Sequence, residues 1–421
     1  MKIAVISDLH IGRTARARDL QPPAVHADAH EEGEADFLEN FYRFVDSFQV
    51  SADYLVVPGD ITDAATPEEV DHANIVVDGV RQSLNVRRNC VVFVPGNHDV
   101  DWSVLRDGDA SHPVRQARRY DAFRRSGSIF REANENAEGD LFVEPFSCLW
   151  EFPNLVVLGY NSAWHDSPDA HHHHGAATAD HIASMREMLM AKGNISNKIK
   201  LFVVHHHTDQ YHNLFDFYSD YSIIDNSQLI IDLAHEFNFD FLIHGHKHFP
   251  QFNSKANNAG HPLCVLGAGS FSRRLVPSMS GYVSNQFHLV EFDGRDPTSS
   301  LVRGKVRSWA YVGGGRWQAS YHKEKRDYRE RVGTGIRHEN FFGTYYPPMR
   351  LERAMDELFD RLITSRQVLR WQTICQHLPE LRYQQTESLL RALENVTSAR
   401  GLTLVVEWPD LFVFAEGDGD D

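Results

Sequence analysis

The chain has 421 residues, of which 42% are hydrophobic and 24% are charged, as is ordinary for a folded globular protein. Its formal net charge of −16 excludes a strongly basic surface over the whole chain, so contact with nucleic acid would depend on a local basic face. The four cysteines are widely spaced, and the sequence shows no signal-peptide pattern. No apolar run approaches the roughly 20 residues that a membrane span needs. These features predict a cytoplasmic protein without a membrane partner.

Short apolar runs in the first two thirds of the chain predict buried strands. The runs are continuous rather than alternating, which is typical of strands covered on both faces. They are Ile3–Ile6, Tyr54–Val57, Val91–Val94, Leu155–Leu158, Leu201–Val204, Phe239–Ile243 and Leu263–Leu266. Helical periodicity lies between them, over Phe37–Phe48, Pro67–Leu84, Val114–Ala133, Asp180–Ala191 and Asn226–Phe237. Strands that alternate with helices predict an α/β architecture in which helices pack on a sheet.

From Gln286 to His322 the apolar residues alternate with polar ones, which predicts antiparallel strands that complete a second sheet. We therefore expect a two-sheet β-sandwich flanked by helices over residues 1–325. A segment rich in Arg, Gly, Tyr and Pro predicts a linker at 326–349, and Asn253–His261 predicts a loop.

The remaining residues predict a small C-terminal α+β module over 350–416, followed by an acidic tail at 417–421. Helical patterns cover Leu351–Thr364, Val368–His377 and Tyr383–Ala399, and strands follow at Leu402–Glu407 and Leu411–Ala415. This order is similar to that of a winged helix. The third helix is only modestly basic, so DNA binding and protein contacts both stay open for the module.

Polar side chains follow several of the predicted strands, at the point where each strand ends. In α/β sheets, ligands bind where strands end and loops begin, so we expect these side chains to surround one cavity. Imidazole and carboxylate together favour Mn, Fe or Zn, and the absence of cysteine among them argues against a thiolate site. The residues stand in DLH, GDITD, GNHD, HHH and GHKH, which begin at Asp8, Gly59, Gly96, His205 and Gly245.

These blocks, in this order, resemble the pattern of the calcineurin-like metallophosphoesterases over about Met1–Asp293. The resemblance implies two divalent metal ions, with Mn expected and Fe, Zn or Ni as alternatives. It implies a first metal held by Asp8, His10, Asp60 and His248, and a second held by Asp60, Asn97, His205 and His246. It further implies that a metal-bridging hydroxide attacks phosphorus while His98 acts near the leaving-group oxygen and Asp99 orients His98.

Several nearby residues have more than one interpretation. In the triple histidine, His205 directly follows its strand and is the favoured ligand, but His206 stays open as the ligand or as a substrate contact. Arg273 and Arg274 are either phosphate-binding residues or a solvated pair. Asp63 either caps the following helix or supports the ligands. The run at 171–174 is either an exposed loop or a lid, and Asn161 and Ser162 are expected in a structural turn.

The reaction class is better determined than the substrate. The leading hypothesis is a phosphodiesterase acting on DNA, RNA or a nucleotide, because Arg303–Arg331 interleaves cations with aromatic residues as in single-strand binding. A small-molecule phosphomonoesterase or cyclic-nucleotide phosphodiesterase is the alternative, and a binding or scaffold protein with an idle metal site is a third. Ala64 follows Asp63 where protein phosphatases of the family carry arginine, which disfavours that activity. An ATPase partner or a homodimer through the C-terminal module is expected by analogy.

Overall fold

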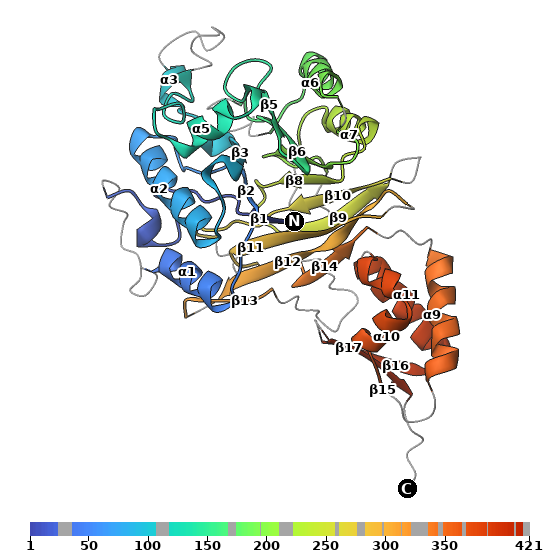
Figure 1. The fold of residues 1–421 in the computed structure, drawn as a ribbon. Coiled ribbons are helices and arrows are strands. Elements are labelled where there is room, and N and C mark those ends of the chain that lie inside the picture. Colours follow the sequence, from blue (N-terminus) through green and yellow to red (C-terminus); the bar gives the residue numbers. More distant parts are fainter. Residues whose placement is uncertain are drawn as a thin grey trace. The chain divides into compact units, whose positions relative to one another are not determined.

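The computed structural model describes residues 1–23, 36–106, 118–166, 174–193, 195–209, 222–256, 261–275, 283–296, 299–312, 314–320, 336–343, 348–363, 368–384, 386–407 and 410–415. The chain divides into two compact units, Met1–Leu289 with Ser308–Ile336 and Val290–Arg307 with Arg337–Asp421. Most of their strands and helices are labelled in Figure 1. No helix among the described residues is long and apolar enough to cross a membrane.

The first sheet is built on parallel strands from the start of the chain. β1 (Lys2–Val5), β2 (Tyr54–Pro58) and β3 (Val91–Val94) pair in parallel and are buried almost throughout, as their continuous apolar runs predict. The alternating segment supplies β11 (Gln286–Arg295), β12 (Val302–Val312) and β13 (Arg316–Ala319). The strand order is β13-β12-β11-β1-β2-β3, and β14 (Glu339–Phe342) pairs with the Gly304–Arg307 part of β12.

The second sheet contains the later apolar runs, so the predicted two-sheet α/β fold is confirmed. Its order is β4-β5-β6-β7-β8-β10-β9, and β6, β7, β8 and β10 pair in parallel. The strands are β4 (Glu138–Asp140), β5 (Ser147–Glu151), β6 (Leu155–Tyr160), β7 (Ile199–Val204), β8 (Phe241–His244), β9 (Gln251–Ala256) and β10 (Pro262–Gly267). The predicted loop from Asn253 is wrong as far as Ala256, because this polar segment forms an edge strand through backbone pairing with β10.

The main helices begin and end close to their predicted limits. They are α1 (Phe37–Ser47), α2 (Pro67–Ser83), α6 (Ala179–Ala191) and α7 (Ser227–Glu236). α2 begins at Pro67 because Thr66 and Glu69 form a capping box around its first turn. α6 and α7 pack on the second sheet around a core that includes Met185, Phe202 and Ile230.

One helix prediction, Val114–Ala133, is wrong over 119–128. Turns cover most of 119–127, and only α5 (Ile129–Glu135) is helical in the second half. Gly127 adopts a φ of 82°, which interrupts a right-handed helix, and the Ser128 hydroxyl then caps a new one. The remaining short elements of this unit are η1 (Arg18–Leu20), η2 (Arg88–Cys90), η3 (Asn97–Asp99) and α3 (Ser103–Arg106).

The C-terminal elements form a small α+β arrangement with its own core. They are α9 (Pro348–Leu362), β15 (Val368–Arg370), α10 (Trp371–His377), η4 (Pro379–Tyr383), α11 (Thr386–Ala399), β16 (Leu402–Glu407) and β17 (Asp410–Ala415). The sheet order is β15-β17-β16, and Leu358, Ile374, Leu393 and Val413 are among the buried residues.

The predicted helical start at Val368 is wrong, because Val368–Arg370 pairs antiparallel with β17 and the helix begins at Trp371. The winged-helix interpretation and the domain limits at 325, 349 and 416 stay predictions. The predicted tail at 417–421 lies outside the described residues.

Candidate metal centre

The predicted donor side chains stand on loops that follow β1, β2, β3, β7 and β8. Hydrogen bonds between the backbones of these loops hold them together. Asp8 N donates to Gly59 O at 3.1 Å, His10 N donates to Asp60 O at 3.0 Å, and Gly245 N donates to His205 O at 3.0 Å. The convergence expected at the ends of parallel strands is therefore present.

The first set of donors is Asp8, His10, Asp60 and His248, the set that the resemblance implies for one metal. His10 Nε2 lies 3.4 Å from Asp60 Oδ2 and 3.2 Å from His248 Nε2. His248 Nε2 lies 3.3 Å from Asp8 Oδ1. Ligands at roughly 2.0–2.2 Å from a common cation lie about 3 Å from one another, so these buried atoms fit a divalent ion.

The second set contains Asp60, Asn97, His205 and His246. Asn97 Oδ1 lies 3.1 Å from His205 Nε2 and 3.0 Å from His246 Nδ1. His205 Nε2 also lies 3.3 Å from Asp60 Oδ1, the carboxylate oxygen that does not face His10. The two oxygens of Asp60 therefore face different donor sets, as a carboxylate shared between two cations would.

His205 presents the geometry of a ligand more directly than its neighbour His206. Its Nδ1 lies 2.9 Å from Pro58 O, which fixes the proton on Nδ1 and leaves the Nε2 lone pair directed at the donors. His206 Nδ1 lies 2.9 Å from Ser162 Oγ, while the buried His206 Nε2 makes no hydrogen bond among the described residues. His206 forms one compact group with His205 and His246, so it lies close to the second donor set. Only His205 of the two neighbours contacts Asp60 and Asn97.

Burial and neighbouring charges shift the pKa values of the donor side chains in different directions. Burial alone would raise the pKa of Asp60, but the charges of His205 and His98 outweigh it and hold that pKa well below its ordinary value. Burial opposes the charge of His205, yet Asp60 outweighs it and raises the His205 pKa to about 9. Burial, aided by the charge of His98, lowers the pKa of His10 to about 3, and burial also lowers the pKa of His246 and His248. The neutral imidazoles of His10, His246 and His248 beside ionised Asp60 are in the protonation states that a cation needs, whereas His205 would lose a proton when a cation binds.

Most of the predicted ligands have a backbone conformation that the sequence did not indicate. L-residues avoid positive φ because Cβ then lies too close to the following carbonyl, at a cost of roughly 1–2 kcal/mol per residue. Such strain gathers at functional sites. The residues with this conformation include Asp8 (φ 52°), His10 (φ 50°), Asp60 (φ 49°), His246 (φ 74°) and His248 (φ 55°).

The ring of His98 lies at the edge of the donors, with 31% of its side chain exposed, so a substrate can reach it. His98 Nδ1 lies 2.9 Å from Asp63 O and 3.8 Å from Asp63 Oδ1. The Asp99 carboxylate instead accepts hydrogen bonds from Gly96 N at 2.8 Å and Thr62 N at 2.8 Å. Asp63 thus holds the imidazole, and Asp99 ties together the loops that carry Asp60 and Asn97.

Asp63 does not cap α2, since Thr66 has that role. Its carboxylate accepts from Thr14 Oγ1 at 2.6 Å and lies 3.7 Å from His10 Nδ1, so it supports the first donor set. The supporting interpretation of Asp63 is the one that these contacts favour.

The two predicted substrate-binding arginines lie in different surroundings. Arg273 is half-buried, and its guanidinium faces His248 and His10. Arg274 is exposed, and its backbone N donates to Thr14 O. Their contact with a substrate stays a prediction.

The turn residues and the histidine run complete the predicted positions. Asn161 Nδ2 donates to Leu141 O at 2.8 Å, as a structural turn residue does. Of the run at 171–174, only His174 lies within the described residues, and its Nε2 is 3.0 Å from Asp225 Oδ2. The other three residues of the run lie outside the described residues, so the lid interpretation stays a prediction.

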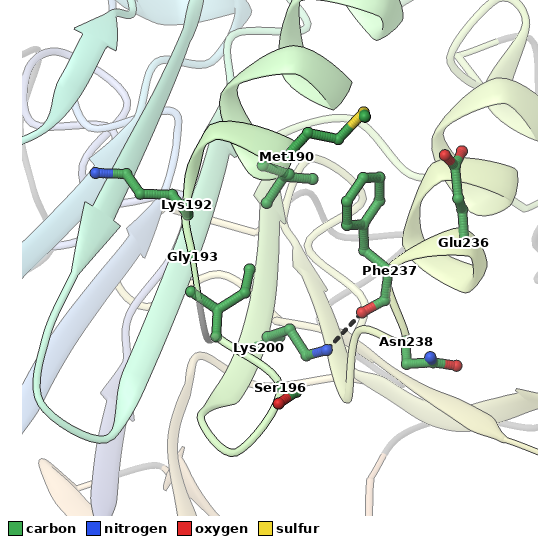
Figure 2. A pocket seen from close by; sticks show the side chains of 10 residues that line it. Met190, Lys192, Gly193, Ser196, Lys200, Glu236, Phe237 and Asn238 are labelled. Carbon is green, nitrogen blue, oxygen red and sulfur yellow. Dashed lines mark hydrogen bonds between the residues drawn. The ribbon is translucent and has the colours of Figure 1, made fainter.

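A surface pocket of about 380 Å³ lies at the ends of α6 and α7, and none of the donors lines it. Figure 2 shows Lys200, whose Nζ donates to Phe237 O at 2.5 Å. Lys192 at its rim pairs with Glu138 at 2.8 Å. The pocket shares no residue with the metal centre.

Buried Asp, Asn and His donors at the ends of parallel strands define a metal-binding site of the kind used for hydrolysis. The model of the calcineurin-like phosphoesterase family matches residues 1–250, and the chain belongs to that family. No curated protein matches the chain.

Solved structures that match the chain are distant in sequence. A conserved uncharacterised protein of Streptococcus pneumoniae TIGR4, described as a predicted phosphoesterase, is 13% identical, with 76% of this chain and 97% of that one covered and a TM-score of 0.28. The phosphopantetheinyl hydrolase of Mycobacterium tuberculosis is 16% identical, with 66% and 96% covered and a TM-score of 0.33. GAP50, the anchor in the inner membrane complex of Plasmodium, is 12% identical, with 77% and 90% covered and a TM-score of 0.38.

Proposed function

We propose that the protein is a phosphodiesterase that uses two divalent metal ions, with Mn as the expected metal and Fe, Zn or Ni as alternatives. The observation that carries the proposal is the carboxylate of Asp60, whose oxygens face separate donor sets at 3.4 Å from His10 and 3.3 Å from His205. The mixture of imidazole, carboxylate and amide donors without thiolate supports this choice of metals.

Bound cations would supply Lewis-acid activation of the ester and of water. The chain's own contribution beyond ligation is His98. Because a carbonyl only accepts, the contact with Asp63 O places a proton on His98 Nδ1, and the free Nε2 edge is left for the substrate. In its imidazolium form, His98 would donate the Nε2 proton to the leaving-group oxygen.

The described part of the basic-aromatic stretch gives no support for a polynucleotide substrate. Trp309, Tyr311 and Trp317 are only 4%, 4% and 6% exposed and pack around the aromatic face of α1, so they cannot stack on bases. In the same stretch Lys305 pairs with Glu339 and Arg307 with Glu291. Residues 313 and 321–331 of this stretch lie outside the described residues. The proposed substrates stay nucleotide diesters, DNA and RNA, and small diesters such as nucleotide diesters are tested first.

A phosphomonoesterase is the second candidate, and the observation in its favour is Arg273 beside the first donor set. A monoester dianion offers one more terminal oxygen than a diester, and a guanidinium is suited to bind it. An idle scaffold is the weakest candidate, because every predicted ligand stands in the converged sets. The ATPase partner, the homodimer and the cytoplasmic location stay proposals that rest on the sequence.

The test compares hydrolysis of bis-p-nitrophenyl phosphate with that of p-nitrophenyl phosphate by Mn-loaded protein. Faster diester cleavage that is lost in His98→Ala supports the phosphodiesterase, and cyclic nucleotides, DNA and RNA are assayed next. Faster monoester cleavage moves the protein to the second candidate. No turnover of either ester with both metals bound contradicts both proposals.

A further inference from the structure

Arg273 stands on a segment that is fixed against the loop after β1. Its backbone N donates to Ser270 Oγ at 2.9 Å, and its carbonyl accepts from Asn285 Nδ2 at 2.9 Å. Ser270 Oγ in turn donates to Asp8 O at 2.7 Å, and Ala15 forms an antiparallel bridge with Arg273. The start of this side chain is therefore held in place relative to the first donor set.

The guanidinium reaches the metal-binding atoms of that set. Arg273 Nη1 lies 3.2 Å from His248 Nε2 and 3.5 Å from His10 Nε2. After burial, the positive charge of Arg273 is among the causes that lower the pKa of both imidazoles. Among the described residues, no carboxylate pairs with Arg273.

Each imidazole Nε2 has a single lone pair, so it cannot accept a hydrogen bond from Arg273 and bind a cation at the same time. With the cation in place, the guanidinium needs another acceptor. A phosphate oxygen of a substrate held at that cation would be such an acceptor, because Arg273 Nη1 lies within 3.5 Å of two of the donor atoms. Guanidinium groups bind phosphate oxygens through strong, charge-assisted hydrogen bonds.

We propose that Arg273 binds a non-bridging oxygen of the substrate's phosphoryl group, and likewise of inorganic phosphate, on the side of the first donor set. This inference rests on the proposed function for its substrate, but phosphate binding itself needs no turnover. Arg273 is then a substrate-binding residue, and its positive charge opposes the nearby cation.

The change in metal affinity on removal of Arg273 distinguishes a phosphate-binding role of this residue from a structural one. A residue that merely supported His248 and His10 would, on removal, weaken the metal. A phosphate-binding cation near the metal would, on removal, leave metal affinity unchanged or tighter, because like charges repel. Phosphate affinity would fall in either case.

The experiment uses full-length Arg273→Gln, with Arg43→Gln as the matched loss of one positive charge. Arg43 lies on α1 and pairs with Glu39 on the surface. Metal content and Mn affinity are measured by elemental analysis and calorimetric titration, and inorganic phosphate is then titrated into the Mn-loaded proteins. Arg273→Lys is included because lysine keeps the positive charge but lacks the planar guanidinium, which can donate two parallel hydrogen bonds to phosphate.

We expect Arg273→Gln to bind phosphate about 10- to 100-fold more weakly, since hydrogen bonds to charged groups contribute on that scale. Its Mn affinity should be unchanged or higher, Arg273→Lys should be intermediate, and Arg43→Gln should match the wild type. Phosphate affinity within threefold of the wild type, or loss of Mn in Arg273→Gln, would overturn the inference. If no ester is hydrolysed but phosphate binding still depends on Arg273, the proposed function fails and this inference stands.

Discussion

The positive φ angles at the candidate metal centre predict an unusual response to glycine at the position of a proposed ligand. His246 has a φ of 74°, whereas His205, its neighbour in the second donor set, has no positive φ. We compare glycine with alanine at each position, so that the imidazole is lost in both variants and only the backbone differs. The backbone N of His246, which donates to Asp8 Oδ1 at 3.0 Å, is kept in both.

At position 246, glycine relieves a left-handed conformation that costs roughly 1–2 kcal/mol with a Cβ. We therefore expect His246→Gly to be more stable than His246→Ala by about 1 kcal/mol. At position 205, where the conformation is ordinary, glycine should be less stable than alanine by roughly 0.5–1 kcal/mol. The predicted difference thus changes sign between two ligands whose donor atoms are 3.2 Å apart.

The assay is urea unfolding in the presence of a chelator, followed by tryptophan fluorescence, which reports on buried Trp150. The chelator is needed because loss of a ligand would otherwise change stability through metal binding. If glycine is no better than alanine at position 246, the assignment of backbone strain to the metal ligands is refuted.

Three further predictions concern the chemistry of the centre. Asp60→Asn should lose at least one metal and about 1,000-fold in kcat, because an amide offers only one ligand oxygen; unchanged metal content by elemental analysis would show that Asp60 is not shared. His98→Ala should keep its metals and lose about 100- to 10,000-fold in kcat, and metal loss in this variant would contradict its place at the edge of the site. Metal binding at pH 7 should release a proton from His205, because Asp60, against the effect of burial, raises the His205 pKa to about 9. Calorimetry in buffers of different ionisation enthalpy should therefore show proton release that fades above pH 9, with metal affinity rising from pH 7 to about 9; affinity that does not change with pH would contradict it.

The sequence predicted that the candidate donor side chains lie together, because each follows directly after a strand that its apolar run makes recognisable. The carboxyl ends of parallel strands meet at one edge, so local patterns were sufficient to bring Asp8, Asn97 and His246 together. The same reasoning predicted α2, because its capping box at Thr66 is also a local feature.

The features that the sequence did not predict depend on contacts between distant segments. The contact of His98 with Asp63 rather than Asp99 is set by how the loops after β2 and β3 lie against each other. The burial of Trp309 and Trp317 follows from α1 covering β12 and β13, and alternation along one strand does not show what covers it. The edge strand β9 is specified by pairing with β10 rather than by its own polar composition.

The most direct test of the shared carboxylate is anomalous diffraction from crystals of the Mn-loaded protein. We expect two Mn peaks about 3.5–4 Å apart, one on each side of the Asp60 carboxylate. The first should be bound by Asp8, His10 and His248, and the second by Asn97, His205 and His246. A single peak, or two peaks that do not share Asp60, would contradict this prediction.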